Sequence, residues 1–311
     1  MSTKLELIAV DGGGGGQRFR GRRVSGEVIE REYPSFTLGE GSLTQNYVER
    51  FSAFINEGFT DISRIVMAVA ALPGSDEERH SLTSSILQAT GARELWLTSD
   101  ITAAHFATVK GDGLVVTVGT GVGAIAVGKN RTALHELSGD GYLIGDEGSA
   151  FWIGKMGLNR ALRYKDGRGT HTALLDEACA FFDTDLSSLA DFVTALDRPV
   201  HRVAQFAPVV TRLATAGDEV ALSIIEMAVD EFVEITIAAR TALDAGENFQ
   251  IVFSGGAIPR DGIVFALVQK RLSAMGLSCE HSSARNIDGA FELAMLNTPG
   301  VYGAITEIAR A

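Results

Sequence analysis

The chain has 311 residues, of which 46% are hydrophobic and 21% charged, a composition typical of a globular protein large enough for two domains. Its formal net charge of -12 argues against DNA or RNA as a partner, because a polyanion is bound by clustered Lys and Arg, and the one basic cluster, Arg18–Arg23, is predicted to be a solvated hairpin. The longest apolar runs are far too short to span a membrane, and Lys4 and Glu6 do not suit a signal peptide, so we expect a cytoplasmic protein.

The first third of the chain is predicted to alternate strands and helices. An apolar run over 5–10 ends at Asp11 and is followed by five consecutive glycines, Gly12 to Gly16. Between 47 and 55 the apolar residues are spaced three and four apart, which is the spacing of one buried helix face. The predicted elements are strands over 5–10, 17–24 and 27–33, a helix over 47–55, a strand over 65–72, a helix over 77–90 and a strand over 94–98.

A similar order of elements begins again after residue 113, which indicates duplication of one α/β plan. The final segment, 288–310, is predicted to be a helix, a break at Pro299-Gly300 and a second helix. We therefore expect two domains, 1–110 and 111–311. The elements predicted for the second domain are strands over 114–118, 124–128 and 133–137, helices over 151–164 and 219–243, and a strand over 250–254.

Three glycine turns lie at predicted strand ends: Gly12–Gly16, Gly119-Thr120-Gly121 and Gly255-Gly256. Backbone without Cβ atoms can approach a ligand closely, and several converging N–H groups form an anion site. A nucleotide has several groups to bind, so three such turns favour a phosphate-binding role over the alternative, a set of loose hairpins. Asp11, directly before the first turn, could then hold Mg2+, which needs only one or two carboxylates beside phosphate oxygens.

Two further carboxylates have both a functional and a structural interpretation. Asp100 follows the strand over 94–98 and precedes a predicted helix, and Asp146 lies in Gly145-Asp146-Glu147-Gly148-Ser149 before another helix. Each is a candidate for a ligand site, and each could instead be a helix cap, because acidic groups suit a helix N-terminus. The two cysteines, Cys179 and Cys279, have no CxxC or His-rich spacing beside them and are expected to be buried, reduced thiols.

Six stretches of the sequence carry a family resemblance. They are VDGGGG (10–15), TSDITAA (98–104), TVGTGVGAIAVG (117–128), GYLIGDEGSAFWIG (141–154), FSGGAI (253–258) and DGAFELA (288–294). Their order resembles that of the N-acetylglucosamine kinase-like branch of the BadF/BadG/BcrA/BcrD ATPase family, in the superfamily of actin, hexokinase and sugar kinases. The resemblance implies two RNase H-like domains in an actin-like ATPase clamshell, a helical insertion over about 171–246, and a last helix that packs back on the first domain.

The resemblance also implies an ATP-dependent sugar kinase, acting on an amino sugar such as N-acetylglucosamine or glucosamine, with ATP and Mg2+ as cofactors. Asp100 matches the catalytic base, beside the sugar, and Asp146 matches a carboxylate that binds sugar hydroxyls. The residues that match the nucleotide-binding motifs are Asp11, Gly12, Gly13 and Gly14 in the first phosphate turn, Gly119, Thr120 and Gly121 in the second, and Gly255 and Gly256 on the adenosine side.

The sequence departs from the family pattern at several places, one of which is the absence of a clear equivalent, around Gly39 to Leu43, of the Asn expected for sugar recognition. The family usually has Thr and often Lys after DGGG, where this chain has Gly15-Gly16-Gln17, and Val122 replaces a common Ser in the second turn. The Trp that often precedes the GDEG segment has no counterpart at Gly139-Asp140-Gly141. These departures motivate one alternative, a sugar or nucleotide sensor that keeps the fold with weakened catalysis.

A second alternative is an ATPase activator of the BadF type, which uses an iron–sulfur cluster at a dimer interface. Such a cluster needs grouped thiolates, and Cys179 and Cys279 do not lie in the corresponding motif. The resemblance implies a small-molecule sugar as partner, whereas the net charge and the short apolar runs predict no nucleic acid and no membrane. A homodimer is the default expectation for assembly.

Overall fold

The computed structural model describes residues 6–13, 16–36, 42–70 and 72–311, and it divides into two compact units. The first unit combines Met1–Lys110 with Ala284–Ala311, and the second is Gly111–Ser283. The second domain was predicted to run to residue 311, whereas the compact unit ends at Ser283 and the C-terminal segment belongs to the first unit.

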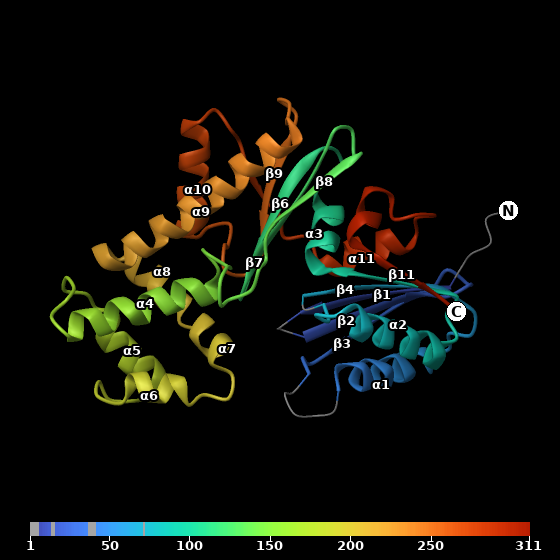
Figure 1. Cartoon of the computed structure of the whole chain (residues 1–311), viewed down its shortest axis with the longest axis horizontal. Helices are drawn as coiled ribbons and strands as arrows, with labels where there is room; N and C mark the ends of the chain where they lie inside the picture. The colour runs from blue at the N-terminus through green and yellow to red at the C-terminus, as the bar shows by residue number, and fades with distance from the viewer. Residues whose placement is uncertain (1–5, 14–15, 37–41, 71) are drawn as a thin grey trace. The chain divides into compact units, whose positions relative to one another are not determined.

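The first unit is a six-stranded sheet with helices on both faces. The strand order is β11-β5-β4-β1-β2-β3, in which β1, β4 and β5 are mutually parallel and the β1–β2–β3 meander is antiparallel. Figure 1 shows α1 and α2 on one face of this sheet and α3 and α11 on the other. The elements are β1 (Glu6–Gly13), β2 (Gly16–Arg22), β3 (Val28–Tyr33), α1 (Leu43–Ile55), β4 (Ile62–Val69), α2 (Asp76–Thr90), β5 (Glu94–Ser99), α3 (Asp100–Thr108), α11 (Asn286–Ala294), a 3-10 helix (Gly300–Ile305) and β11 (Glu307–Arg310).

The packing of this unit explains why the sequence of β1 is a nearly continuous apolar run. Both faces of a central strand are covered by helices, so alternation of polar and apolar residues disappears. Ile8 and Val10 pack on the α1 side with Phe51, which is fully buried. The next strand, β2, alternates, because Phe19 enters this core while its arginines lie on the opposite face.

The C-terminal segment completes the first unit in two ways. Helix α11 packs tightly on α3, where a Cβ atom at Gly289 would lie 2.0 Å from the carbonyl oxygen of Ala103. Strand β11 then pairs antiparallel with β5, with Ile308 opposite Trp96. The prediction of a second helix up to residue 310 is therefore wrong: the chain makes a 3-10 turn and then an edge strand, because an unpaired edge of β5 is available to it.

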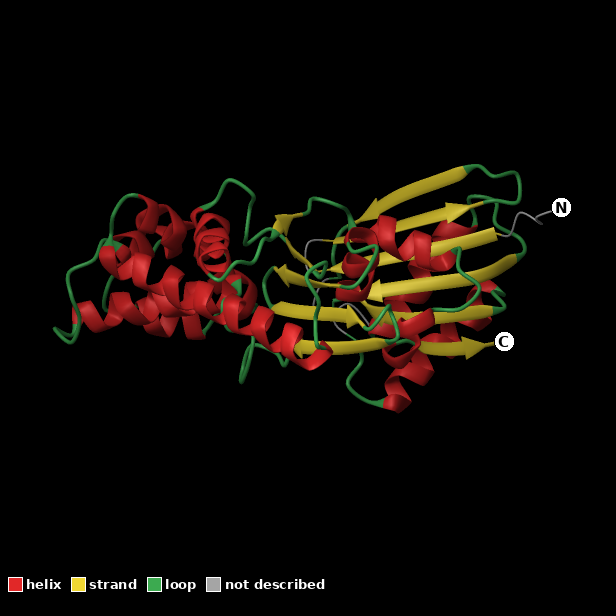
Figure 2. Cartoon of the chain, turned by 90° about the horizontal axis from the view of Figure 1, so that it is seen from above, coloured by secondary structure: helices red, strands yellow, loops and turns green. Residues whose placement is uncertain are grey.

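The second unit repeats the five-strand plan of the first. Its order, β10-β9-β6-β7-β8, again places an antiparallel meander of three strands beside parallel strands. Figure 2 shows helices of this unit, drawn in red, gathered in one cluster at the left. The elements are β6 (Gly113–Val118), β7 (Val122–Gly128), β8 (Ala133–Ser138), α4 (Ala150–Lys165), α5 (Leu174–Phe182), α6 (Leu189–Thr194), α7 (Pro199–Ala204), α8 (Ala207–Thr215), α9 (Glu219–Leu243), β9 (Gln250–Ser254), α10 (Ile263–Ala274) and β10 (Glu280–His281).

Local capping fixes the start of the long helix α9. The Asp218 carboxylate accepts a hydrogen bond from the Ala221 N–H at 2.9 Å, and its other oxygen accepts from the Thr172 hydroxyl and the Ala173 N–H, both at 2.8 Å. One residue therefore joins α9 to the start of α5. Within the described residues, no helix combines the length and apolar character needed to cross a membrane.

The two cysteines are free thiols, Cys179 on α5 and Cys279 before β10. Both thiols are free, as predicted, but their side chains are half-buried where buried ones were predicted. Cys179 lies beside the buried face of α5, which is formed by Leu174, Leu175, Ala178 and Phe182. Burial raises the pKa of both thiols, which keeps them protonated and unreactive at neutral pH.

Candidate active site

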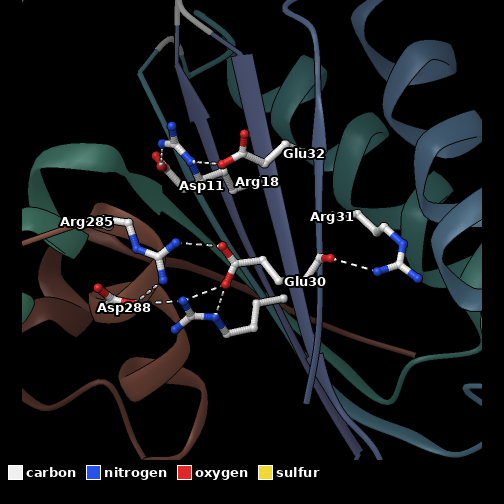
Figure 3. Close-up of polar contacts among 8 residues, drawn as sticks. Asp11, Arg18, Glu30, Arg31, Glu32, Arg285 and Asp288 are labelled. Carbon is white, nitrogen blue, oxygen red and sulfur yellow. Dashed lines mark hydrogen bonds and ion pairs between the residues drawn. The ribbon is translucent and has the colours of Figure 1, made fainter.

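Asp11 lies near the carboxyl end of β1, on the face of the sheet covered by α3 and α11. Its residue exposure is 6%, and burial raises the pKa of its carboxyl above the usual value, while Arg18 opposes that shift. Asp11 and Arg18 are direct cross-strand partners in the β1–β2 hairpin, and Nη1 of Arg18 lies 3.3 Å from Oδ2 of Asp11 (Figure 3). The side chain of Asn286, at the start of α11, also hydrogen-bonds this carboxylate.

Asp100 is the first residue of α3, directly after β5. Because β1 and β5 are both parallel to β4, their carboxyl ends lie at the same edge of the sheet. Burial raises the pKa of Asp100 to about 6, and the negative charge of Asp11 adds to the shift. The structure therefore brings the two predicted carboxylates of this unit into one electrostatically coupled pair.

The capping interpretation of Asp100 is wrong. The N-cap of α3 is Ser99, whose hydroxyl accepts from the Thr102 N–H at 3.2 Å. Asp100 follows the cap, and its carboxylate accepts hydrogen bonds from the backbone N–H groups of Asp100 and Ile101. A serine cap leaves this carboxylate available for another role.

The glycines of the first turn have different structural reasons. A Cβ atom at Gly12 would lie 2.7 Å from the Tyr47 hydroxyl and 3.1 Å from Cγ1 of Val69, so these side chains would have to move to admit one. At Gly13 the same atom would meet nothing within 4 Å, which leaves that backbone open to a ligand. Gly14, which was predicted to bind phosphate, lies outside the described residues.

The predicted solvated basic hairpin is instead a set of ion pairs. The Arg20 side chain is 12% exposed and pairs with Glu30 at 2.6 Å and Asp288 at 2.8 Å. Arg285 lies between the same two carboxylates, 2.7 Å from Glu30 and 3.2 Å from Asp288 (Figure 3). These charges fasten the start of α11 to β2 and β3, and so hold Asn286 close to Asp11.

In the second unit, the turn Gly119-Thr120-Gly121 joins β6 to β7 and is fastened to the start of α4. The carbonyl oxygens of Gly119 and Thr120 accept from the Ala150 and Phe151 N–H groups at 2.9 and 3.1 Å. The N–H of Gly119 donates to the Gly121 carbonyl at 2.8 Å. Among the described residues the N–H groups of Thr120 and Gly121 have no protein acceptor, so both are available to an anionic ligand.

The turn Gly255-Gly256 lies directly beside the end of β6. Gly255 has a φ of +107°, and a Cβ atom there would be 2.2 Å from the Val118 carbonyl oxygen, so this position requires glycine. Gly256 has open space around it. The structure thus brings the second and third predicted turns together at one edge of the second sheet.

These two turns border a cavity of about 770 Å³ that lies wholly in the second unit. Its wall is mostly apolar with a few polar groups, and its volume falls in the range of small-molecule and cofactor sites. The residues lining it include Gly119, Thr120, Ala150, Ile153, Ala204, Gln205, Pro208, Thr211, Thr215, Gly256, Pro259, Gly262 and Ile263.

Asp146 belongs to the second unit and contacts the β6–β7 turn. Its Oδ1 accepts from the Val122 N–H at 3.3 Å, and a Cβ atom at Gly121 would lie 2.8 Å from its Oδ2. Its φ is +60°, a conformation that few residues other than glycine, Asn and Asp adopt and one that is often found at functional sites. Its capping interpretation is also wrong, because the N-cap of α4 is Ser149, which accepts from the Trp152 N–H at 3.1 Å.

The carboxylate chemistry of the first unit fits Mg2+. Within the described residues no three His, Cys, Asp or Glu side chains gather as a metal site. A magnesium ion that arrives with nucleotide phosphates needs only one or two carboxylates, and Asp11, acceptor-only and buried at the strand end, suits this role. Its hydrogen bonds with Arg18 and Asn286 would fix its orientation.

The two sheets share one five-strand order, to which the first unit adds the edge strand β11. This pair of RNase H-like units has the fold of the actin-like ATPases and sugar kinases. Residues 8–291 match the model of the BadF/BadG/BcrA/BcrD ATPase family, and the chain belongs to this family.

Several characterised relatives and solved structures are similar to the chain. It is 32% identical to an N-acetyl-D-glucosamine kinase of Dictyostelium discoideum over 167 residues, and this match spans only about half of each protein, 51% of either chain. It is 24% identical over 298 residues to an N-acetylmuramic acid/N-acetylglucosamine kinase of Clostridium acetobutylicum, covering 92% of this chain and 95% of that one. The structure of a proposed N-acetylglucosamine kinase from Chromobacterium violaceum superimposes with a TM-score of 0.70 at 21% identity, covering 94% and 100%.

Sequence reasoning missed three parts of this site. Arg18 was treated as one of several solvated arginines, although pairing across the hairpin places it opposite Asp11. Asn286 lies just before the DGAFELA stretch and carries no motif of its own. The cavity wall from α7 and α8 lies in the helical insertion, where the family resemblance offers no motif.

Proposed function

We propose that this protein is an ATP-dependent sugar kinase that transfers the γ-phosphate of ATP to a hydroxyl of an amino sugar, N-acetylglucosamine or glucosamine. The observation that carries this proposal is the Asp11–Asp100 pair, in which one carboxyl has its pKa raised to about 6 by burial and by the other charge. A general base is most effective when its pKa lies near the working pH. The names of the relatives support the choice of sugar.

The second unit supports the nucleotide half of the proposal. Its cavity is large enough for a nucleoside, and it is bordered by Gly119, Thr120 and Gly256. The N–H groups of Thr120 and Gly121 would then donate to phosphate oxygens. Open space at Gly256 would admit the nucleotide close to the backbone.

The proposed reaction assigns each residue a separate task. Asp100 accepts the proton of the sugar hydroxyl while the hydroxyl oxygen forms a bond to the γ-phosphorus. The bond between the γ-phosphorus and the bridging oxygen breaks, and ADP leaves with that oxygen. Asp146 accepts hydrogen bonds from other sugar hydroxyls, and the turn amides hold the phosphates. Asp11 would hold Mg2+, which when bound supplies positive charge against the phosphate oxygens. Positioning and charge neutralisation are the main requirements of phosphoryl transfer.

The test is an assay of ADP release with ATP and Mg2+ across hexoses, amino sugars and N-acetylated amino sugars, with the product identified by its mass. We expect sugar-dependent ADP release and a phosphorylated amino sugar. Binding of sugar or nucleotide without any phosphorylated product, at every enzyme concentration, would instead favour the sensor alternative.

Asp100→Asn is the matched variant for this assay. It removes the base while it keeps the shape of the side chain, so kcat should fall by at least ~10²-fold. The Asp146→Asn variant keeps both an acceptor for the Val122 N–H and a side chain that tolerates positive φ. It should therefore fold normally while its KM for sugar rises.

A cytoplasmic location and assembly as a homodimer stay predictions of the sequence. Cell fractionation tests the first, and light scattering of the purified protein tests the second.

A further inference from the structure

The turn after β1 has no side-chain donor or cation of its own. Every position from 12 to 16 is glycine, so the turn residues could offer a phosphate group only backbone N–H donors. A phosphoryl group in transfer carries several negative charges, and enzymes of this reaction class place fixed cations against them. A side-chain cation of the first unit that contacts the phosphate must therefore come from outside this turn.

Arg18 is the cation that the hairpin places beside the carboxylate pair. Its Nη1 lies 3.3 Å from Asp11, and its Nε lies 2.9 Å from Glu32 on β3 (Figure 3). The Glu32 side chain is 66% exposed, so this second ion pair is weakly held. The Arg18 side chain is 43% exposed, whereas that of Asp11 is only 8% exposed, so the guanidinium covers the buried carboxylate and also faces solvent.

The donors of Arg18 are only partly used. Its hydrogen bonds involve Nε and Nη1, and among the described residues no acceptor contacts Nη2. Arginine has five N–H donors in a planar fork that matches the oxygens of a phosphate group. The other arginine of this face that lies close to Asp11 along β2, Arg20, is instead held by Glu30 and Asp288.

We propose that Arg18 is a further catalytic residue, which donates hydrogen bonds through its guanidinium to the phosphoryl group in transfer. This inference rests on the proposed kinase function. Under that function Asp100 must lie beside the reacting hydroxyl and phosphorus, and Arg18 contacts Asp11, the carboxylate whose charge acts on Asp100. Asp11 would also hold Mg2+, whose positive charge would weaken the attraction of this carboxylate for Arg18 and leave the guanidinium available to the phosphate. Arg18 itself forms and breaks no covalent bond.

The experiment compares the full-length protein with Arg18→Met, Arg18→Lys and the control Arg31→Met. Arg31 lies on β3, is 47% exposed and pairs with one glutamate, Glu57, so its loss removes the same charge from a similar setting. For each variant, kcat, the KM values for ATP and sugar, the Kd values of AMP, ADP and ATP, and the melting temperature are measured.

Arg18→Met should lower kcat by ~10²-fold or more, as does the loss of other phosphate-contacting arginines. It should weaken ATP binding by ~10-fold while AMP binding stays within about twofold, because AMP lacks the transferred group. Arg18→Lys keeps the charge but not the fork, so it should fold normally and still lose ~10-fold in kcat. Arg31→Met should stay within about twofold of the wild type in every constant.

Two results would overturn the proposal. One is an Arg18→Lys variant that keeps the wild-type kcat, whether or not Arg18→Met folds. The other is an Arg18→Met variant that loses AMP and ATP affinity equally. A disturbed nucleotide site would weaken both ligands alike, whereas a lost contact to the transferred phosphate would weaken only ATP. An inactive wild-type protein would count against the kinase function itself, and the comparison of AMP with ATP would still test Arg18 as a phosphate donor.

Discussion

At the scale of single residues, the Asp11–Asp100 pair governs how activity should depend on pH. The pKa of Asp100 is raised to about 6, so its carboxyl gains a proton as the pH falls below that value and can no longer act as a base. We expect kcat/KM for the sugar to fall about tenfold per pH unit below the apparent pKa. Because two carboxylates interact, that apparent value belongs to the pair. A rate profile that stays flat down to pH 5 would contradict the assignment of Asp100.

The same raised pKa makes a prediction about stability. The unfolded chain releases the Asp100 proton near pH 3.8 and the folded chain only near pH 6, so ionisation of this group costs stability as the pH rises between these values. Asp100→Asn should therefore stabilise the protein by about 1–3 kcal/mol above pH 6. The gain should vanish near pH 4. Urea unfolding at pH 4 and pH 8 measures both, and a loss of stability at pH 8 would indicate a structural role instead.

Sequence named candidate site residues only where a residue lies in a motif. Asp11 lies near the end of a strand, and Asp100 and Asp146 follow a strand or a glycine, so their positions made them candidates. Their capping alternatives could not be decided from sequence, because Ser99 and Ser149 were equally good caps and only the hydrogen bonds show which residue accepts. Arg18 and Asn286 acquire their roles from pairing across a hairpin and from a helix distant in sequence.

At the scale of elements, Gly255 and Gly256 should respond differently to the same substitution. Gly255→Ala places a methyl group 2.2 Å from a carbonyl oxygen at a φ of +107°, so it should destabilise the protein by about 2–4 kcal/mol. Gly256→Ala meets nothing within 4 Å, so stability should change by less than about 0.5 kcal/mol. The added methyl group instead enters the cavity, and AMP affinity should fall by roughly tenfold.

Thermal unfolding and AMP titration of both variants test this difference. If the two variants lose equal stability, both positions of the turn are constrained by packing. Unchanged AMP affinity in Gly256→Ala would indicate that the nucleotide does not approach this turn.

The packing of α11 on α3 makes a second prediction for an element. Ala favours a helix over Gly by about 1 kcal/mol, but a methyl group at position 289 would lie 2.0 Å from the backbone oxygen of Ala103, which has no rotamer to change. The clash should outweigh the helix preference, so Gly289→Ala should lower the free energy of unfolding by about 1–3 kcal/mol. Because α3 begins with Asp100, kcat should fall as well.

Gly74→Ala is the control for this substitution, since a Cβ atom there meets nothing within 4 Å. Its melting temperature and kcat should match those of the wild type. Equal behaviour of Gly289→Ala and Gly74→Ala would show that α11 can shift away from α3 without harm.

Helices were predicted correctly where apolar residues recur at a clear helical spacing. The helix predicted over 219–243 coincides with α9, and its capping by Asp218 explains the sharp start. The strand β11 was misread as helix because its pairing partner, β5, lies more than two hundred residues away in sequence, so no local pattern records it. The helices α5 to α8 pack on one another and on α4 and α9, and their short segments carry weak patterns when considered singly.

At the scale of the whole molecule, nucleotide binding should protect the backbone amides of one unit from hydrogen exchange. Among the described residues, those that line the cavity all belong to the second unit, so AMP should slow hydrogen exchange in peptides that contain Thr120, Pro208 and Gly256. Peptides of α1 and α2 should be unchanged. Exchange measured by mass spectrometry on the full-length protein tests this, and protection of α1 and α2 by AMP would contradict it.

The first unit is assembled from two stretches of chain that are separated by the whole of the second unit. During synthesis the ribosome therefore delivers every strand of the second sheet before it delivers α11 and β11. Until then β5 has an open edge, and Asp11 lacks the amide that α11 brings to it. The second unit is thus the earlier one to be covalently complete, and the coupled carboxylates reach their final surroundings only after α11 has left the exit tunnel.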